Sequence, residues 1–138
     1  DGITLIGNYS FYHFDVLVSA TIPNDLKMIG NSAFCNSKKL TDINIPDSVT
    51  EIGDNAFRYC LLGENVTIHE NVKTIGEYSF YYCTSLKHVY NHSTEPQELT
   101  AIFNSKDITI HVPAASVEKY RKAQHWRDMN IVAMRDER

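Results

Sequence analysis

The sequence predicts a solenoid of stacked coils, each contributing a short strand, and three observations carry this prediction. Glycine recurs every 23 residues within a fixed apolar motif. A second block, rich in β-branched residues, keeps the same period. A unit of 23 residues cannot bury an apolar face by itself, so repeated units must cover one another and share a continuous core. The length of 138 residues therefore counts stacked coils and does not measure one globular domain.

The first block of each repeat reads Ile-Gly-x-x-(Ala/Ser)-Phe. We expect its glycines to occupy turns that need positive φ or a close approach of two backbone segments; they are Gly7, Gly30, Gly53 and Gly76. The small residue before the phenylalanine indicates a short helical turn. The phenylalanines should form an internal aromatic stack, which a fifth copy without its glycine extends: Phe11, Phe34, Phe57, Phe80 and Phe103.

The second block alternates β-branched and polar residues, which is typical of a strand with one buried face. Four copies are spaced by 23 residues, and a fifth, ending at Pro113, arrives two residues early. The regular copies end at Pro23, Pro46, His69 and His92. In the first, second and fourth copies a leucine lies six residues before the terminal Pro or His. In the third copy Gly63 stands at that position.

These blocks together resemble the 23-residue unit of the BspA-like (Treponema pallidum type) leucine-rich repeat proteins. The resemblance covers roughly residues 3–113, with departures at His69, His92, Gly63 and the shortened fifth unit. It implies an α/β fold: a right-handed leucine-rich repeat horseshoe with short parallel strands on its concave face. It also implies a non-enzymatic protein that is secreted or displayed on a bacterial cell surface, as in the Bacteroides-type members.

The two ends of the chain differ from the middle. We expect residues 1–113 to form the repeat array, with a partial first repeat and about four and a half further units. Residues 114–138 should form a C-terminal cap, with a helix at about 115–124 and a final strand at about 131–134. Ile3 stands at a position inside the repeat, so we expect a cap or further repeats to precede Asp1 in the natural protein.

Four of the six histidines fall on strand positions predicted to face outward on the concave sheet. With one tyrosine they form the candidate ligand-contact set: His69, His88, Tyr90, His92 and His111. A tyrosine ring offers an aromatic platform, and imidazoles donate or accept hydrogen bonds, as recognition of a sugar or a protein requires. Exposed strand positions also tolerate polar residues that have no function, so both interpretations remain open.

A metal site on the histidine face is a further alternative. His69 and His92 should lie on adjacent strands about 4.8 Å apart, with His88 or His111 as a third ligand. No carboxylate or cysteine completes the set, so we expect neither a metal ion nor a cofactor. Cys60 and Cys83 share one repeat position and, like Cys35, should be free, buried thiols.

No motif of nucleophilic, phosphate-binding, dinucleotide-binding or zinc-protease chemistry occurs, so we expect no enzyme activity. Thirteen Lys and Arg against 17 Asp and Glu give a net charge of −4, which argues against nucleic-acid binding. No apolar run approaches the ~20 residues of a membrane-spanning helix, so we expect no membrane insertion. The sequence thus indicates a monomeric adhesion-type module that contacts a protein or glycan partner, or alternatively a structural spacer that displays another domain.

Overall fold

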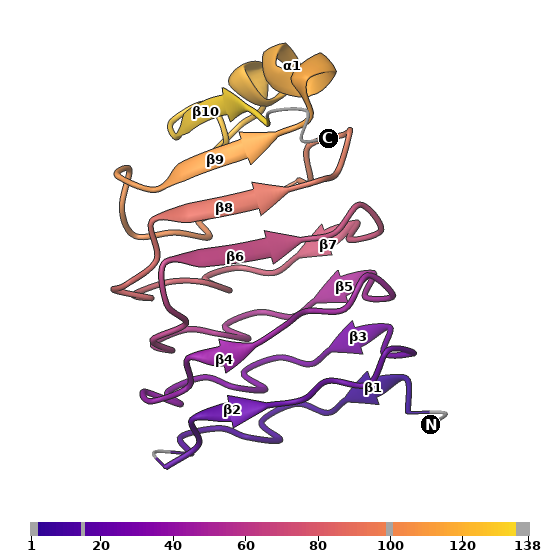
Figure 1. Ribbon diagram of the computed structural model, residues 1–138, viewed down its shortest axis with the longest axis vertical. Coiled ribbons are helices and arrows are strands. Elements are labelled where there is room, and N and C mark those ends of the chain that lie inside the picture. The colour runs from indigo at the N-terminus through magenta and orange to yellow at the C-terminus, as the bar shows by residue number, and fades with distance from the viewer. Residues whose placement is uncertain (1–2, 15, 99–100, 135–138) are drawn as a thin grey trace.

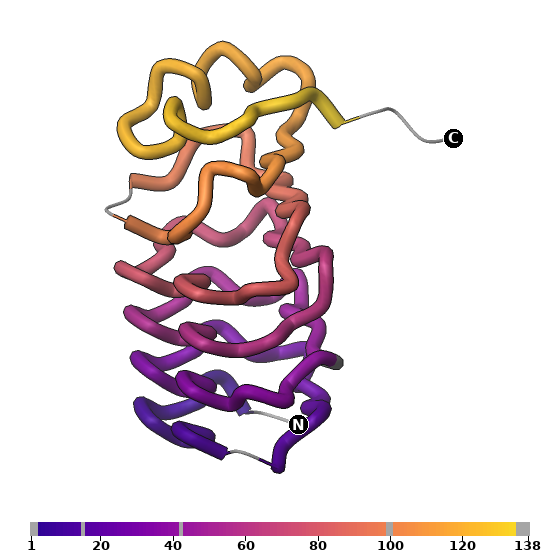
Figure 2. Tube along the Cα trace, turned by 90° about the vertical axis from the view of Figure 1, so that its left-hand side faces the viewer, coloured from indigo at the N-terminus to yellow at the C-terminus, as the bar shows by residue number. Residues whose placement is uncertain are grey.

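The computed structural model describes residues 3–14, 16–98 and 101–134. The chain winds coil over coil into a solenoid whose strands all pair in parallel, with the cap at the C-terminal end (Figures 1 and 2). Paired strands up to β8 are offset by 23 residues, as the pairing of Ile6 with Ile29 shows, and the last two pairings are offset by 21, as the pairing of Tyr90 with His111 shows. The predicted repeat fold is confirmed.

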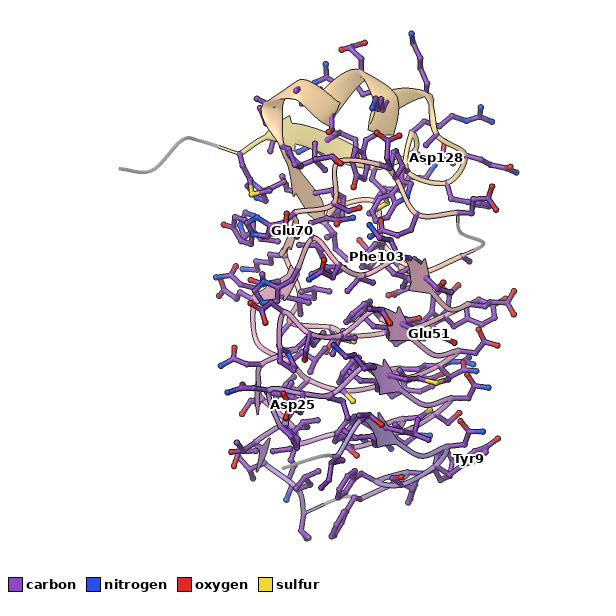
Figure 3. The ribbon with its side chains drawn as sticks, turned by 90° about the vertical axis from the view of Figure 1, so that its right-hand side faces the viewer. Tyr9, Asp25, Glu51, Glu70, Phe103 and Asp128 are labelled. Carbon is purple, nitrogen blue, oxygen red and sulfur yellow. The ribbon has the colours of Figure 1, made fainter. Side chains whose placement is uncertain are left out.

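Each of the first four repeats contributes two strands, so the structure has strands on two sides where the sequence indicated one. The first sheet has the order β1 (Leu5–Ile6), β3 (Met28–Ile29), β5 (Glu51–Ile52) and β7 (Thr74–Ile75). Figure 3 looks onto this sheet, with Glu51 on strand β5. These strands come from the residues around the Ile-Gly pair, which the sequence analysis treated as turns. Two residues per coil are too few for the alternation that identifies a strand from sequence.

The second set of strands comes from the β-branched block. β2 (Ser19–Ala20) pairs with β4 (Asp42–Ile43) in a separate two-stranded sheet. A four-stranded sheet follows, in the order β6 (Asn65–Ile68), β8 (His88–Asn91), β9 (Thr109–Val112) and β10 (Asn130–Ala133). The candidate ligand-contact residues lie on or directly after strands of this four-stranded sheet.

Gly63 explains why β4 and β6 do not join. Leu62 and Gly63 both have left-handed backbones, with φ of 60° and 69°. The Leu62 N–H donates to the Leu40 carbonyl at 2.8 Å. The Leu62 side chain is buried, whereas the two adjacent repeats bury the leucine at the Gly63 position, Leu40 and Leu86. This displacement separates the strands and leaves a cavity of about 220 Å³ between Ile43 and Val66.

The predicted phenylalanine stack forms the centre of the core. Successive ring centroids lie 5.1, 5.4, 5.5 and 5.9 Å apart from Phe11 to Phe103, and the rings are nearly parallel. The three central rings have no exposed surface. Each ring therefore covers its neighbour, which is how a unit of 23 residues buries its apolar face.

None of the four repeated glycines has positive φ, and three of them, Gly30, Gly53 and Gly76, are required instead by the close approach of the preceding coil's backbone. A Cβ atom on Gly30 would lie 2.7 Å from the backbone of Ile6, Gly7 and Asn8 in the preceding coil. The left-handed positions lie elsewhere in the turn, for example at Tyr9 (φ 61°) and at its equivalents one coil apart.

The segment between glycine and phenylalanine is a hydrogen-bonded turn, not the short helical turn that we expected. Its N–H groups donate along the solenoid axis to the next coil, as from Tyr9 to Asn31 (2.9 Å) and from Phe11 to Ala33 (2.6 Å). These N–H groups are thereby unavailable for helical bonds to carbonyls four residues back.

The cap closes the last coil with buried aromatic residues. A 3₁₀ turn (Ala114–Ser116) leads into α1 (Val117–Lys122), and β10 then pairs with β9. Trp126 and Tyr120 are fully buried; the Trp126 Nε1–H donates to the Gln97 carbonyl at 2.8 Å, and the Tyr120 hydroxyl to the Ser93 carbonyl at 2.7 Å. No helix in the described part of the chain is long and apolar enough to cross a membrane.

Candidate recognition face

The outward positions of β6, β8, β9 and β10 form the surface that we call the recognition face. Parallel pairing without slippage places Thr67, Tyr90, His111 and Val132 in one row across the four strands. Alternate residues such as Val89 and Ile110 point inward and are fully buried. The alternation of the strands thus holds this row of side chains on a rigid, close-packed base.

Tyr90 and His111 form the centre of this face. Their rings stack with centroids 4.3 Å apart and an angle of 16° between planes. His111 is also 3.0 Å from His88, measured between His88 Nδ1 and His111 Nε2, so that one imidazole donates a hydrogen bond to the other. Burial, and then the charge of His88, lower the pKa of His111 below its ordinary value. The three side chains therefore hold one another in a fixed arrangement.

The other predicted pair, His69 and His92, lies directly after β6 and β8. Their rings stack with centroids 6.1 Å apart and planes 14° apart, with no hydrogen bond between them. The structure therefore brings the four histidines together as two separate pairs: one stacked, and one joined nitrogen to nitrogen.

A surface groove of about 790 Å³ runs over the C-terminal half of the face. The described residues that line it are all uncharged by type, with no Asp, Glu, Lys or Arg among them: Thr67, Tyr90, His92, His111, Val132, Ala133 and Met134. Three of the five predicted contact residues thus line it. His88 does not line the groove but is hydrogen-bonded to His111, which does. His69 lines the smaller cavity between β4 and β6.

Val132, Ala133 and Met134 were missed by the sequence analysis. They belong to the last strand and its end, which carries no copy of the repeat motif and was treated only as part of the cap. β10 continues the sheet beyond β9, so the cap supplies an apolar wall to the groove. The short apolar run at residues 131–134 was the available signal.

A cluster of tyrosines on the turns was also missed. The Arg58 guanidinium lies 5.2, 5.2 and 5.6 Å from the ring centroids of Tyr59, Tyr78 and Tyr81. Tyr59 stacks on Tyr82 at 5.2 Å, and both remain partly exposed. Tyrosine at equivalent turn positions of consecutive repeats was the signal in the sequence. This turn cluster is a second aromatic surface, away from the recognition face.

The three cysteines are free and buried, as expected. The Cys60 and Cys83 thiols donate to the carbonyls of Phe34 and Phe57 in the preceding coil, at 2.9 and 3.1 Å. Ser37 occupies the same repeat position and donates to the Phe11 carbonyl at 2.8 Å. Burial raises the pKa of all three thiols, that of Cys83 to about 12. The repeated cysteine is therefore a structural hydrogen-bond donor, held far from the thiolate form that a nucleophile needs.

No group of three or more His, Cys, Asp or Glu side chains in the described ranges is arranged to hold a metal ion. A third ligand from His88 or His111 does not join His69 and His92. The arrangement on the recognition face offers an aromatic platform, hydrogen-bonding imidazoles and an apolar wall, which are the elements of a binding surface.

Three bacterial leucine-rich repeat proteins are among the solved structures that this chain resembles. The Treponema pallidum leucine-rich repeat protein is 25% identical (TM-score 0.68), with 80% of this chain and 54% of that one covered. A Bacteroides ovatus protein is 26% identical (TM-score 0.53; 78% and 34% covered). A Eubacterium ventriosum protein, 20% identical with a TM-score of 0.58 (85% and 32% covered), shares the fold. The chain thus spans about a third to a half of the length of these proteins.

Among curated proteins none gives a significant match. The model of the BspA type leucine-rich repeat region, in six copies, matches residues 4–123, which is most of the chain. The repeat motif, the stacked coils and this match agree with one another, and the chain belongs to the BspA-type leucine-rich repeat family.

Proposed function

We propose that this chain is a non-enzymatic recognition module of adhesion type, which contacts a protein or glycan partner through the recognition face. Leucine-rich repeat folds commonly serve as interaction modules, because a solenoid presents regularly spaced side chains on one broad surface. The family is often secreted or surface-exposed, and we propose the same location here, with the module acting as a monomer.

The groove is the observation that carries this proposal. The described lining has no Asp, Glu, Lys or Arg and carries one stacked Tyr–His platform, which suits a partner that offers an apolar or sugar ring face together with hydrogen-bonding groups. Tyr90 is already held in place by His111, so little side-chain entropy is lost when a partner packs against it. Binding would therefore centre on Tyr90, with His92 and Met134 at the edges of the contact.

The proposal is tested with fluorescently labelled protein on a glycan array and on immobilised mucin. The double variant Tyr90→Ser/His92→Gln should lose at least tenfold in apparent affinity for every glycan or mucin that the unaltered chain binds. Its far-ultraviolet circular dichroism spectrum should be unchanged, because both side chains lie on the outer side of the sheet.

The matched control is Tyr59→Ser/Tyr82→Ser, which removes the same kind of aromatic surface from the turn cluster. This control should bind as the unaltered chain does. Binding that survives the first substitution and disappears with the second would move recognition to the turn cluster. Absence of binding to both classes of probe would favour the structural spacer.

A further inference from the structure

We propose that His88 and His111 form a two-ligand binding site for a divalent transition-metal ion such as Ni²⁺ or Cu²⁺. The observation is the approach of His88 Nδ1 to His111 Nε2 at 3.0 Å, across strands β8 and β9. The inference departs from the expectation of no metal, and it concerns a different pair from His69 and His92. It does not depend on the proposed partner binding.

The distance between the two nitrogens suits two ligands of one ion. Metal–nitrogen bonds to imidazole are about 2.0–2.1 Å long, so two nitrogens at a right angle around an ion lie about 2.9 Å apart and at a tetrahedral angle about 3.3 Å apart. The observed 3.0 Å falls between these values. In the hydrogen bond the two nitrogens face each other, so each ring has to turn by about 35–45° before both lone pairs converge on one ion.

Proton balance also permits binding. In the neutral pair each ring carries one proton, and one of these lies between the facing nitrogens as the hydrogen bond. An ion at this place requires that proton to shift to the other nitrogen of the same ring through solvent. Both facing nitrogens then present lone pairs, and the neutral pair releases no proton.

The surroundings hold this pair in register. His88 lies opposite Thr109, and His111 lies opposite Tyr90, so the two histidines are diagonal neighbours on paired strands. Tyr90 stacks on the His111 ring, which opposes tilting of that ring but leaves it free to turn in its own plane. Since no third His, Cys, Asp or Glu ligand joins them in the described residues, water would fill the remaining positions on the ion. Imidazole ligands suit Cu²⁺ and Ni²⁺, with Cu²⁺ bound more tightly in the general order of stability.

His69 and His92 provide a control within the same chain. They are likewise one coil apart, but their rings stack nearly parallel, 6.1 Å apart. Imidazole lone pairs lie in the ring plane, so two stacked parallel rings cannot direct theirs at one common ion. Two histidine pairs on one sheet are thus expected to differ in metal binding.

Isothermal titration calorimetry with NiCl₂, in a non-coordinating buffer at pH 7.5, tests the site. The unaltered chain should bind one equivalent of Ni²⁺, and His88→Gln/His111→Gln should lose at least tenfold in affinity. The control His69→Gln/His92→Gln should keep its affinity within twofold. Electron paramagnetic resonance with CuCl₂ should show coupling to two imidazole nitrogens in the unaltered chain and in the control, but not in the first variant.

Circular dichroism of all three proteins checks that the substitutions leave the fold intact, and the single variant His111→Gln gives a second route if the double variant does not fold. Failure of the unaltered chain to bind Ni²⁺ at millimolar concentration would overturn the proposal. Equal loss in both double variants would overturn it as well, because the geometry of the His88–His111 pair would then not matter.

Discussion

Replacing Gly53 by alanine should destabilise the solenoid severely, whereas the same change at Gly7 should not. An added Cβ on Gly53 would lie 2.6 Å from Asn31 Oδ1 and 2.7 Å from both Asn31 N and Gly30 C. Ordinary contacts begin at 3.4 Å, so the two coils would have to separate by about 0.7 Å (3.4 minus 2.7). The obstacle is mainly backbone, which cannot rotate out of the way.

That separation would disrupt two hydrogen bonds between the coils. The Gly53 N–H donates to the Ile29 carbonyl at 2.8 Å, and the Asp54 N–H donates to Asn31 Oδ1 at 2.9 Å. Each such bond contributes about 1 kcal/mol, and overpacking adds about 1–3 kcal/mol. After allowing for the lower entropy of alanine in the unfolded chain, we expect a net loss of roughly 2–4 kcal/mol.

Gly7 provides the matched control, because among the described residues a Cβ added there would meet only Ser10 Oγ, at 3.4 Å. Gly7 does not have positive φ, so alanine there should leave the stability unchanged or raise it by up to about 1 kcal/mol. Urea unfolding followed by far-ultraviolet circular dichroism measures both variants. Free energies of unfolding of the two variants that agree to within about 0.5 kcal/mol would refute the argument that close coil approach requires Gly53.

Further predictions concern the core, the cap and the thiols. Phe57→Ala should cost about 3–5 kcal/mol in urea unfolding, because the ring is fully buried between two others; a cost below 1 kcal/mol would contradict the stack. Asn91→Ala should cost about 1–3 kcal/mol, since the buried Gln97 Oε1 loses the Asn91 Nδ2 donor at 2.9 Å; Asn130→Ala, on an exposed strand position, is the comparison. Cys83 should resist iodoacetamide at pH 8 in the folded chain and react once the chain unfolds, as mass spectrometry would show. Because burial raises the pKa of Cys83 to about 12, the unfolded chain loses this proton first, and the free energy of unfolding should fall as the pH rises from about 8.5 towards 12. Rapid alkylation in the folded state would refute the buried thiol.

The sequence by itself determined the repeat, its period and the residues that share a ladder. A fixed period of 23 specifies which residue lies over which, so the Phe11–Phe103 stack followed directly. Alternation in the second block likewise identified Tyr90 as a residue that faces outward and Val89 as one that faces the core. These properties depend only on the spacing of apolar residues along the chain, and that spacing is written in the sequence.

Only the tertiary structure decided how side chains meet on that frame. His88 and His111 form a hydrogen bond between diagonal neighbours, whereas His69 stacks on His92. The two pairs differ because their side chains adopt different orientations on the folded sheet. The close approach at Gly30 and the break after Gly63 depend on the distance between coils, and the period does not specify that distance. Met134 joined the groove because the cap folds back onto β9, a contact made by residues outside the repeat. The spacing of residues along the chain determines which residues lie next to each other in adjacent coils. The packing of the coils and the cap determines how those side chains are oriented and which of them touch.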